Sequence, residues 1–263
     1  MELDIFQIDA FANRSFSGNP AAVIPLTAWL DDDVMQAIAE ENNLSETVYF
    51  VPEEDGYRIR WFTPKAEVNL CGHATLASAY HLFQCDPTLK NIRFYSASGP
   101  LNVSRRDHLI RIDFPANPAT ACATPSRLVD ALGAEPNDCL QTADKRRFLA
   151  IFSDPQQVLN ASPNMSLLAT LEATGVLISS PGHRSEYDFI QRFFAPKIGV
   201  PEDPVTGSAF TNSTPYWAEH LGKSTLSARQ VSPRGGDVRC ELVGDRVYMT
   251  GQARYFMKGT VYL

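Results

Sequence analysis

Alternating apolar and polar side chains predict that this chain is built mainly of short β-strands. From residue 3 to residue 11 the side chains alternate with the two-residue period of a strand, so the first strand begins almost at once. Aromatic and branched residues, with proline and glycine at the boundaries, mark the following strands. In the first half we predict strands at 21–25, 47–51, 57–63 and 91–97, and a hairpin over 101–114.

Two segments of the first half have helical spacing instead. Apolar residues recur at helical intervals after the acidic run 31–33, whose carboxylates suit the N-cap and first turn of a helix, and Asn42-Asn43 predicts its end. A second helix is predicted from Gly72 to about Phe83. It is apolar on every side and rich in small residues, which favours a buried, central position under a sheet.

The strongest pattern is a repeat about half the chain length apart. Arg60–Lys65 reads Arg-Trp-Phe-Thr-Pro-Lys and is followed by Cys71–Thr75, while Arg192–Lys197 reads Arg-Phe-Phe-Ala-Pro-Lys and is followed by Asp203–Ala209. Each copy is an aromatic strand that ends at a proline, then a loop, then a glycine that opens a small-residue helix. The repeat predicts two similar lobes, with a small-molecule site in the cleft between them.

The second half repeats the order of elements with different loops. We predict a helix around 164–174, strands at 176–180 and 187–194, a helix from Gly207 that Pro215 kinks or restarts, a hairpin over 237–250 and a last strand over 254–262. Three prolines between Pro115 and Pro125 indicate the crossing between lobes. The predicted domains are therefore an N-terminal lobe, 1–115, which the strand within 254–263 completes, and a C-terminal lobe, 116–253.

Composition excludes several classes of function. The 263 residues carry a net charge of −7, which argues against binding nucleic acid or an anionic membrane, since both rely on basic patches. The five cysteines are odd in number and form no CxxC pair, so we expect reduced thiols in a cytoplasmic protein and neither a disulfide framework nor a structural zinc site. The N-terminus does not resemble a signal peptide, and no apolar run has the length of a membrane span.

The two glycine-tipped helices suggest a site for an anion. A helix N-terminus has unpaired N–H groups and a partial positive charge, and glycine lets a ligand approach the backbone. Gly72-His73-Ala74 and Gly207-Ser208-Ala209 would offer two such ends to one small carboxylate. The alternative is that both glycines only permit close packing of helix and sheet. Neither a GxGxxG nor a P-loop motif is present, so a nucleotide is not indicated.

Three ionisable residues are candidates for chemistry near these tips. His73 lies in the first turn, where the positive helix end should lower its pKa and favour the neutral imidazole. Asp203 precedes the second tip, although a turn carboxylate before Pro204 is the common alternative. Glu46 precedes a strand, and its counterpart in the second half lies near Gly175, where no carboxylate stands. An acid on one side only is what an active site on a duplicated scaffold requires.

Other reactive residues fit less well. Cys71 precedes a helix N-terminus, which can lower a thiol pKa, but a buried inert thiol is the simpler interpretation because Thr206 stands at the matching position. Ser208 lacks the GxSxG context of a hydrolase. The histidines show no HxH or HxxxH spacing, so no metal is expected.

Taken together, these motifs resemble the PhzF-like family of phenazine-biosynthesis proteins, within the diaminopimelate epimerase-like fold. The resemblance runs along the whole chain in the family's order and rests on the following segments: Asp9–Phe11, Phe16–Val23, Asn43–Thr47, Arg60–Pro64, Cys71–Thr75, Ser98-Gly99, Glu202–Ala209, Arg234–Gly236 and Gly244–Val247.

The resemblance implies an α+β fold of two pseudo-symmetric lobes, each a curved mixed β-sheet wrapped around a central α-helix. It also implies a homodimer that needs neither a metal nor an organic cofactor. The family's characterised reaction isomerises a dihydro-hydroxyanthranilic acid: a glutamate moves a proton between ring carbons, while a histidine and an aspartate hold polar groups.

By motif position, the resemblance assigns these catalytic roles to Glu46, His73 and Asp203. The substrate carboxylate would be bound at the helix tips, by Gly72, Ala74, Gly207 and Ser208.

The chain departs from its relatives at two places. Diaminopimelate-type epimerases use a cysteine at each helix tip, whereas this chain has Cys71 at one tip and Thr206 at the other, which disfavours two-thiol racemisation. Many PhzF-like proteins continue with His-Cys after Gly-Ser-Ala, whereas Phe210-Thr211 follows here and predicts a more apolar pocket wall. The substrate is therefore left open, and the alternative function is a non-catalytic member of the family that binds a small anion or another protein.

Overall fold

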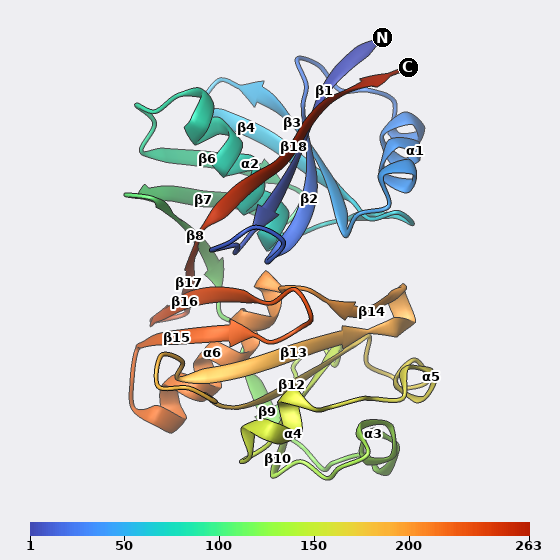
Figure 1. Cartoon of the computed structure of the whole chain (residues 1–263), viewed down its shortest axis with the longest axis vertical. Coiled ribbons are helices and arrows are strands. Elements are labelled where there is room, and N and C mark those ends of the chain that lie inside the picture. The colour runs from blue at the N-terminus through green and yellow to red at the C-terminus, as the bar shows by residue number, and fades with distance from the viewer. The chain divides into compact units, whose positions relative to one another are not determined.

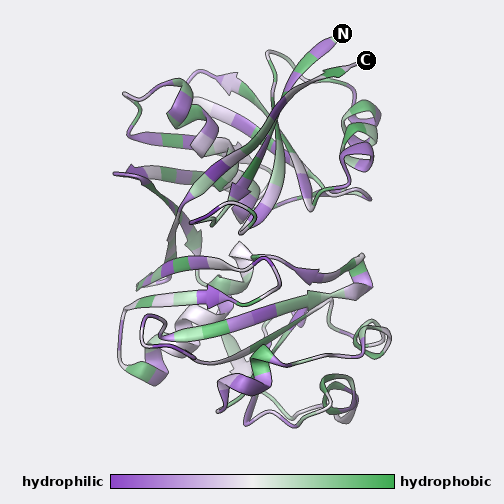
Figure 2. Cartoon of the chain, viewed as in Figure 1, coloured by the Kyte–Doolittle hydropathy of each residue, from purple (hydrophilic) through white to green (hydrophobic).

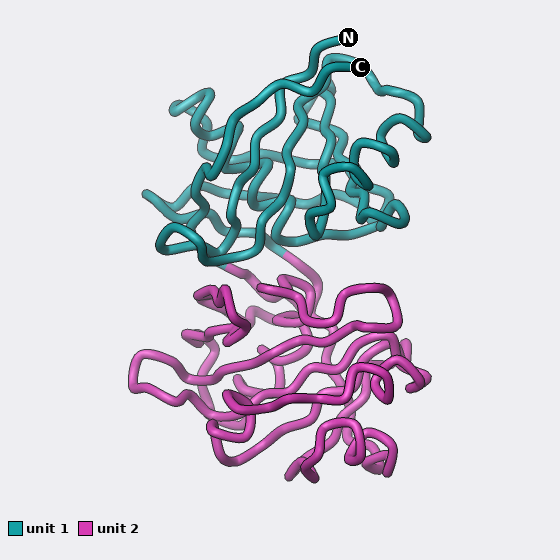
Figure 3. Tube along the Cα trace, turned by 45° about the vertical axis from the view of Figure 1, so that its right-hand side comes forward, with its two compact units in different colours: residues 1–113, 250–263 teal, residues 114–249 magenta.

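A computed structural model describes residues 1–263, and contacts along the chain divide it into two units (Figure 3). Unit 1 comprises Met1–Asp113 together with Thr250–Leu263, and unit 2 comprises Phe114–Met249. Both consist of mixed β-sheet with few helices, which confirms the predicted α+β class.

Unit 1 is a mixed sheet that the last strand of the chain enters (Figure 1). Strand β18 pairs antiparallel with β1 from Glu2↔Tyr262 to Ala10↔Ala253, so the predicted strand 254–262 forms. The elements are β1 (Glu2–Ala10), β2 (Asn19–Pro25), α1 (Asp32–Asn42), β3 (Glu46–Glu53), β4 (Gly56–Phe62), β5 (Glu67–Val68), α2 (Gly72–Cys85), β6 (Asn91–Ser96), β7 (Gly99–Arg106), β8 (Leu109–Pro115) and β18 (Ala253–Tyr262).

Unit 2 has the same kinds of element, several of them shorter. Its helices and strands are β9 (Ala119–Ala121), α3 (Ser126–Leu132), β10 (Asp138–Thr142), β11 (Arg147–Ile151), α4 (Pro155–Leu159), α5 (Met165–Leu168), β12 (Gly175–Pro181), β13 (Phe189–Ala195), the 3₁₀-helix η1 (Pro196–Ile198), β14 (Val200–Asp203), α6 (Gly207–Leu221), β15 (Thr225–Gln230), β16 (Gly236–Val243) and β17 (Arg246–Gly251).

Strand pairing within each unit confirms the internal repeat. In unit 1, β2–β3 is parallel, β3–β4 antiparallel, β4–β6 parallel and β6–β7 antiparallel. In unit 2, β11–β12, β12–β13, β13–β15 and β15–β16 follow the same sequence of directions. Helix α2 follows β5 as α6 follows β14, so the two glycine-tipped helices occupy the same place in the two topologies.

The small residues of α2 explain its central position in unit 1. From Gly72 to Phe83 every residue except Tyr80 is buried. The helix packs on β1, β2, β3, β7 and β18. The surrounding strands alternate between apolar and polar side chains along much of their length (Figure 2). Large apolar side chains are buried in the same unit, among them Trp61 of β4 and Phe94 of β6.

Helix α6 runs from Gly207 to Leu221 with Pro215 inside it, so the proline does not restart the helix, and the predicted kink stays a prediction. A proline has no N–H to donate to the carbonyl four residues earlier, here that of Thr211. The Asn117 N–H donates to that carbonyl instead, at 3.0 Å, and the Asn212 side chain returns a hydrogen bond to the Asn117 carbonyl at 2.8 Å. The segment between the predicted lobes therefore satisfies the group that the proline leaves open.

The predicted helix over 164–174 is wrong in its extent. Asn164 caps α5 by accepting from the Leu167 N–H at 3.1 Å, but the helix ends at Leu168. The Thr170 hydroxyl then binds the Leu167 carbonyl at 2.8 Å, and turns lead to Gly175. Helices α3 and α4 and strands β10 and β11 were not predicted, since each has seven residues or fewer and shows little periodicity.

The acidic run lies where it was predicted, with Asp31 at the N-cap position and Asp32 and Asp33 in the first turn of α1. The Asp31 side chain, however, makes no capping hydrogen bond. Asp32 accepts from Arg60 at 2.7 Å, and this ion pair lowers the pKa of Asp32. The end of the helix was predicted correctly, since Asn43 adopts the left-handed conformation with φ of 46°. None of the helices combines the length and apolar sequence needed to cross a bilayer.

Candidate functional site

The N-terminal tip of α2 brings together two of the predicted catalytic residues. Glu46 is the first residue of β3, and its Oε2 lies 3.0 Å from Nε2 of His73, the second residue of α2. The His73 side chain is 5% exposed and the Glu46 side chain 17% exposed. The histidine is thus shielded from water, while the glutamate keeps a limited opening to it.

The other edge of the His73 ring faces two further side chains. Its Nδ1 lies 3.3 Å from Nδ2 of Asn19 and 3.5 Å from Sγ of Cys71. Asn19 begins β2, which runs parallel to β3 with Ala21 opposite Glu46, so both strands deliver a polar side chain to the same ring. The role of Asn19 was missed: its Gly-Asn-Pro context predicted only a turn, and the contact spans 54 positions.

The ionisation of His73 is opposite to the prediction. Burial acts to lower the pKa of His73, but the anionic forms of Cys71 and Glu46 outweigh burial and raise this pKa well above 6.5. Burial also raises the pKa of the Cys71 thiol to about 11, so this group is neutral at pH 7. With the thiol neutral, the Glu46 carboxylate 3.0 Å from Nε2 is the neighbour that favours the imidazolium, against burial and the helix dipole.

The same three side chains are the candidate metal ligands of unit 1. One donor atom each of Glu46, Cys71 and His73 lies within 4.8 Å of the other two. However, Glu46 faces Nε2 and Cys71 faces Nδ1, at opposite edges of the ring. A zinc ion about 2.0–2.3 Å from each ligand would bind only one ring nitrogen, so this arrangement fits a proton-handling pair better than a metal centre.

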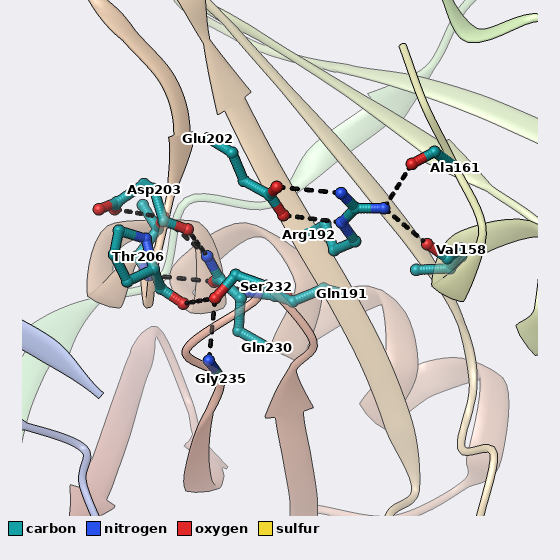
Figure 4. A network of polar contacts seen from close by, with 11 residues as sticks. Val158, Ala161, Gln191, Arg192, Glu202, Asp203, Thr206, Gln230, Ser232 and Gly235 are labelled. Carbon is teal, nitrogen blue, oxygen red and sulfur yellow. Dashed lines mark hydrogen bonds and ion pairs between the residues drawn. The ribbon is translucent and has the colours of Figure 1, made fainter. Parts of the chain in front are cut away.

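The tip of α6 in unit 2 is built around Asp203, the last residue of β14 (Figure 4). Its Oδ2 accepts from the Thr206 hydroxyl at 2.5 Å. Buried Gln230 donates to the Asp203 carbonyl at 2.7 Å and accepts from the Thr206 N–H at 3.0 Å. Gln191 also donates to the Gln230 side chain, at 3.2 Å. This network fixes the loop that carries the Asp203 carboxylate into the start of the helix.

Strand register shows what stands opposite Glu46 in the repeat. Ala21 pairs with Glu46 in unit 1, and Arg147 pairs with Gly175 at the matching place in unit 2. The predicted absence of a second acid is thus confirmed at Gly175. A Cβ on Gly175 would lie 2.5 Å from Cζ of Phe193, so the ring occupies the space that a side chain would need.

An arginine lies over that glycine. Arg147 stacks on the Phe193 ring, with 5.1 Å from Cζ to the ring centre, and donates to Ser208 and Asn212 at the start of α6. Sequence reasoning missed this residue because Arg147 is 61 positions from Ser208 and belongs to no motif.

Phe210 and Thr211 do not form the apolar pocket wall that was expected. Phe210 is fully buried and packs against Phe189, with ring centres 6.2 Å apart, so it is a core residue of unit 2. The Thr211 hydroxyl donates to the Ser208 carbonyl at 2.7 Å, inside the helix.

Of the predicted site residues, Glu46, His73, Gly72 and Ala74 gather at the tip of α2. Asp203, Gly207 and Ser208 gather at the tip of α6. A joint role of the two sets stays a prediction.

Comparison with known proteins shows the family. The family model described as phenazine biosynthesis-like protein, PhzC-PhzF, matches residues 8–259. An uncharacterized isomerase of Pseudomonas aeruginosa is 48% identical over the full length of both chains. The crystal structure of a PhzF-family phenazine biosynthesis protein of Enterococcus faecalis has a TM-score of 0.95 at 42% identity and covers both chains completely.

A more distant structure extends the likeness in fold alone. A hydroxyproline epimerase of Agrobacterium vitis has a TM-score of 0.65 at 9% identity, over 99% of this chain and 92% of its own. The epimerase-like fold predicted from the sequence is confirmed. The chain therefore belongs to the phenazine biosynthesis-like, or PhzF, family.

Proposed function

We propose that this protein is an isomerase that moves a carbon-bound proton on a small carboxylic acid, with Glu46 as general acid and base. The single observation that carries the proposal is the contact of Glu46 with buried His73 at the tip of α2. Two full-length relatives named as isomerases or PhzF proteins support the reaction class. The proposed reaction needs neither a metal nor an organic cofactor.

The environment of Glu46 suits proton transfer from carbon. A general base must lie within hydrogen-bond reach of the proton that it removes, and it works best when partly shielded from water. The Glu46 side chain is only 17% exposed. His73 holds one carboxylate oxygen by an ion pair, so the base keeps one orientation. The first N–H groups of α2, at Gly72 and His73, have no partner within the helix and would stabilise negative charge that develops on the substrate.

Racemisation with two cysteine bases is a poorer explanation. It needs a thiolate, but burial raises the pKa of Cys71 to about 11. The matching position at the other helix is Thr206, whose hydroxyl donates to Asp203. A single carboxylate that picks up and returns the proton agrees with both residues.

We assign supporting roles to the residues of the second tip by family position. Asp203 would hold a polar group of the substrate, and Gly207 and Ser208 would bind an anionic oxygen through the first turn of α6. The buried network of Thr206 and Gln230 supports this assignment because it holds Asp203 in one place without neutralising its charge.

The test is hydrogen exchange at carbon. The protein is incubated in D₂O with a set of small cyclic amino- and hydroxycarboxylic acids that includes dihydro-hydroxyanthranilic acid, and deuterium uptake is followed by mass spectrometry. We expect uptake with at least one acid. Since general acid–base catalysis contributes about 10²- to 10⁴-fold, Glu46→Gln should reduce the uptake rate by this factor.

The matched control is Glu40→Gln, which removes an exposed carboxylate from α1 and should leave uptake unchanged. Unchanged uptake in Glu46→Gln would contradict the role of Glu46. Tight binding of an acid without any exchange in the unaltered protein would favour the alternative, a member of the family that binds anions without catalysis.

A further inference from the structure

The positively charged side chain of Arg147 lies at the N-terminal end of helix α6. Its Nη2 donates to Ser208 Oγ at 2.8 Å, and its Nη1 donates to Asn212 Oδ1 at 2.9 Å. Ser208 and Asn212 are four positions apart in α6, so the guanidinium lies along the first turn. The N-terminus of a helix carries partial positive charge and attracts anions, so a cation there is unfavourable unless something offsets it.

No carboxylate is in direct contact with the Arg147 guanidinium. The hydrogen-bond partners of Arg147 are a neutral hydroxyl and a neutral amide, and it forms no ion pair. The carboxylates of Asp144 and Asp203 act on its charge only from a longer distance, and burial lowers the pKa of Arg147. A shielded charge without a counter-ion is costly in a folded protein.

Other shielded arginines of the chain are paired differently. Arg192 binds Glu202 through two hydrogen bonds, and Arg229 binds Asp237. Arg60 binds both Glu67 and Asp32. Arg147 thus stands out among them, since its side-chain hydrogen bonds go to neutral groups.

The hydroxyl of Ser208 is oriented by this contact. Because its oxygen accepts from Arg147, its own hydrogen points elsewhere, and no acceptor within the chain takes it. A hydroxyl that accepts from a cation is also a stronger donor. The contact therefore prepares Ser208 to donate to an anionic oxygen at the tip of α6.

Equivalent positions of the internal repeat carry different polar residues in the two units. At matching positions, unit 1 has Ala21 beside Glu46, whereas unit 2 has Arg147 beside Gly175. His73 follows the first glycine and Ser208 follows the second. The first residues after the two glycines thus differ: a histidine beside Glu46 at one tip, and a hydroxyl held by Arg147 near Asp203 at the other.

We propose that Arg147 is a positioning residue that holds Ser208 as a donor to the substrate carboxylate and so makes the protein select acids over neutral analogues. This inference rests on the proposed function, in which Ser208 binds an anionic oxygen. It goes further by naming the residue that sets the charge preference.

The test is binding measured by calorimetry, with 3-hydroxyanthranilate and its uncharged amide as the probes. The unaltered protein should bind the acid more tightly than the amide. Arg147→Met should weaken binding of the acid by about 10- to 100-fold, the effect of losing a hydrogen bond to a charged group, and leave the amide unaffected. Arg147→Lys keeps the charge but not the planar fork, so it should recover part of the preference.

Two controls separate positioning from general damage. Arg146→Met removes the same charge from the exposed neighbouring residue and should change neither affinity. Ser208→Ala and the double variant Arg147→Met/Ser208→Ala should bind the acid equally weakly, because Arg147 acts through Ser208. If Arg147→Met does not fold, the affinities of Arg147→Lys and Ser208→Ala for the acid and the amide still test whether Arg147 acts through Ser208.

Several outcomes would overturn the inference: equal affinity for acid and amide in the unaltered protein, no binding of the acid, or full affinity for the acid in Arg147→Met. Selective binding of the acid without carbon exchange would refute the proposed isomerase and leave the role of Arg147 intact.

Discussion

At the scale of single residues, His73 shows how neighbouring side chains reverse an expectation drawn from the helix alone. The positive end of α2 favours a neutral imidazole, and burial acts in the same direction. Cys71 and Glu46 act against both effects and together raise the pKa of His73, with the Glu46 carboxylate 3.0 Å from the ring in a site shielded from water. The consequence is a glutamate that is held in place by a cation.

The raised pKa of His73 predicts how stability depends on pH. A histidine whose pKa is higher in the folded than in the unfolded protein stabilises the fold fully below about pH 6.5, and this stabilisation is lost as pH rises through the folded value. We therefore expect the free energy of unfolding to fall above pH 6.5. Glu46→Gln should reduce that fall, since it removes one of the two groups that raise the pKa of His73.

Titration of the imidazole C–H signals by NMR checks this directly. His81 and His183 serve as internal references, since burial lowers the pKa of both below 6.5. The charges that face His73 are those of Glu46 and Cys71, and the thiol stays neutral until about pH 11. A pKa of His73 at or below 6.5 would contradict the prediction.

At the scale of elements, the connection from β1 to β2 determines where Asn19 meets His73. Gly18 in this connection has a φ of +76°, a conformation that side chains disfavour. A Cβ at this position would also collide with the Ala10 carbonyl oxygen and lie 2.9 Å from Cβ of Ala12. The backbone itself is the obstacle, so the connection has little freedom to adjust.

Gly18→Ala should therefore destabilise the protein by two separable amounts. The left-handed conformation costs about 1–2 kcal/mol for a residue with a side chain, and overpacking adds about 1–3 kcal/mol. Gly244→Ala is the matched control, because Gly244 has a φ of +58° and open space around its Cβ. Urea unfolding of both variants measures the difference, and equal losses would show that the collision is relieved without cost.

The elements also show what the sequence could predict. The strands of the first half were found because they alternate, and α2 was found because its glycine and small residues are distinctive. The region from α3 to α5 was missed since its elements are short and are stabilised by a core cluster drawn from distant segments. Pairing in β10 and β11 depends on those tertiary contacts more than on local preference.

The site was predictable for the ionisable residues of the motifs, whereas the segment Phe16–Val23 did not reveal the role of Asn19 within it. Glu46 and His73 stand in family motifs, so they were named from the sequence, and the structure places them in contact. The roles of Asn19 and Arg147 depend on side chains 54 and 61 positions away, which a local pattern does not reveal. The rise in the pKa of His73 likewise follows from packing and not from the helix that carries it.

At the scale of the whole molecule, duplication has produced two units with one order of strand directions but different polar residues at equivalent helix tips. The units also differ in how their sheets are completed. In unit 1 the last strand of the chain, β18, pairs along β1, whereas in unit 2 the short strand β9 pairs with β10. The homodimer and the cytoplasmic location expected from the sequence stay predictions.

The pairing of β18 with β1 predicts that the chain tolerates circular permutation. The Leu263 N–H donates to the Met1 carbonyl at 2.8 Å, so the two ends are adjacent and a short Gly-Ser linker can join them. New ends between Arg184 and Ser185 would lie in an exposed loop between β12 and β13. We expect this permutant to fold and to unfold cooperatively, with a circular dichroism spectrum like that of the parent.

Two comparisons make the expectation specific. A permutant opened between Val48 and Tyr49 interrupts β3 where both residues are fully buried, and it should not fold. Deletion of residues 253–263 should expose one edge of β1 and destabilise unit 1, because β1 then keeps only β2, which pairs with its residues 6–10. If the Arg184–Ser185 permutant failed to fold while the deletion folded normally, pairing of β18 with β1 would not be what completes the sheet of unit 1.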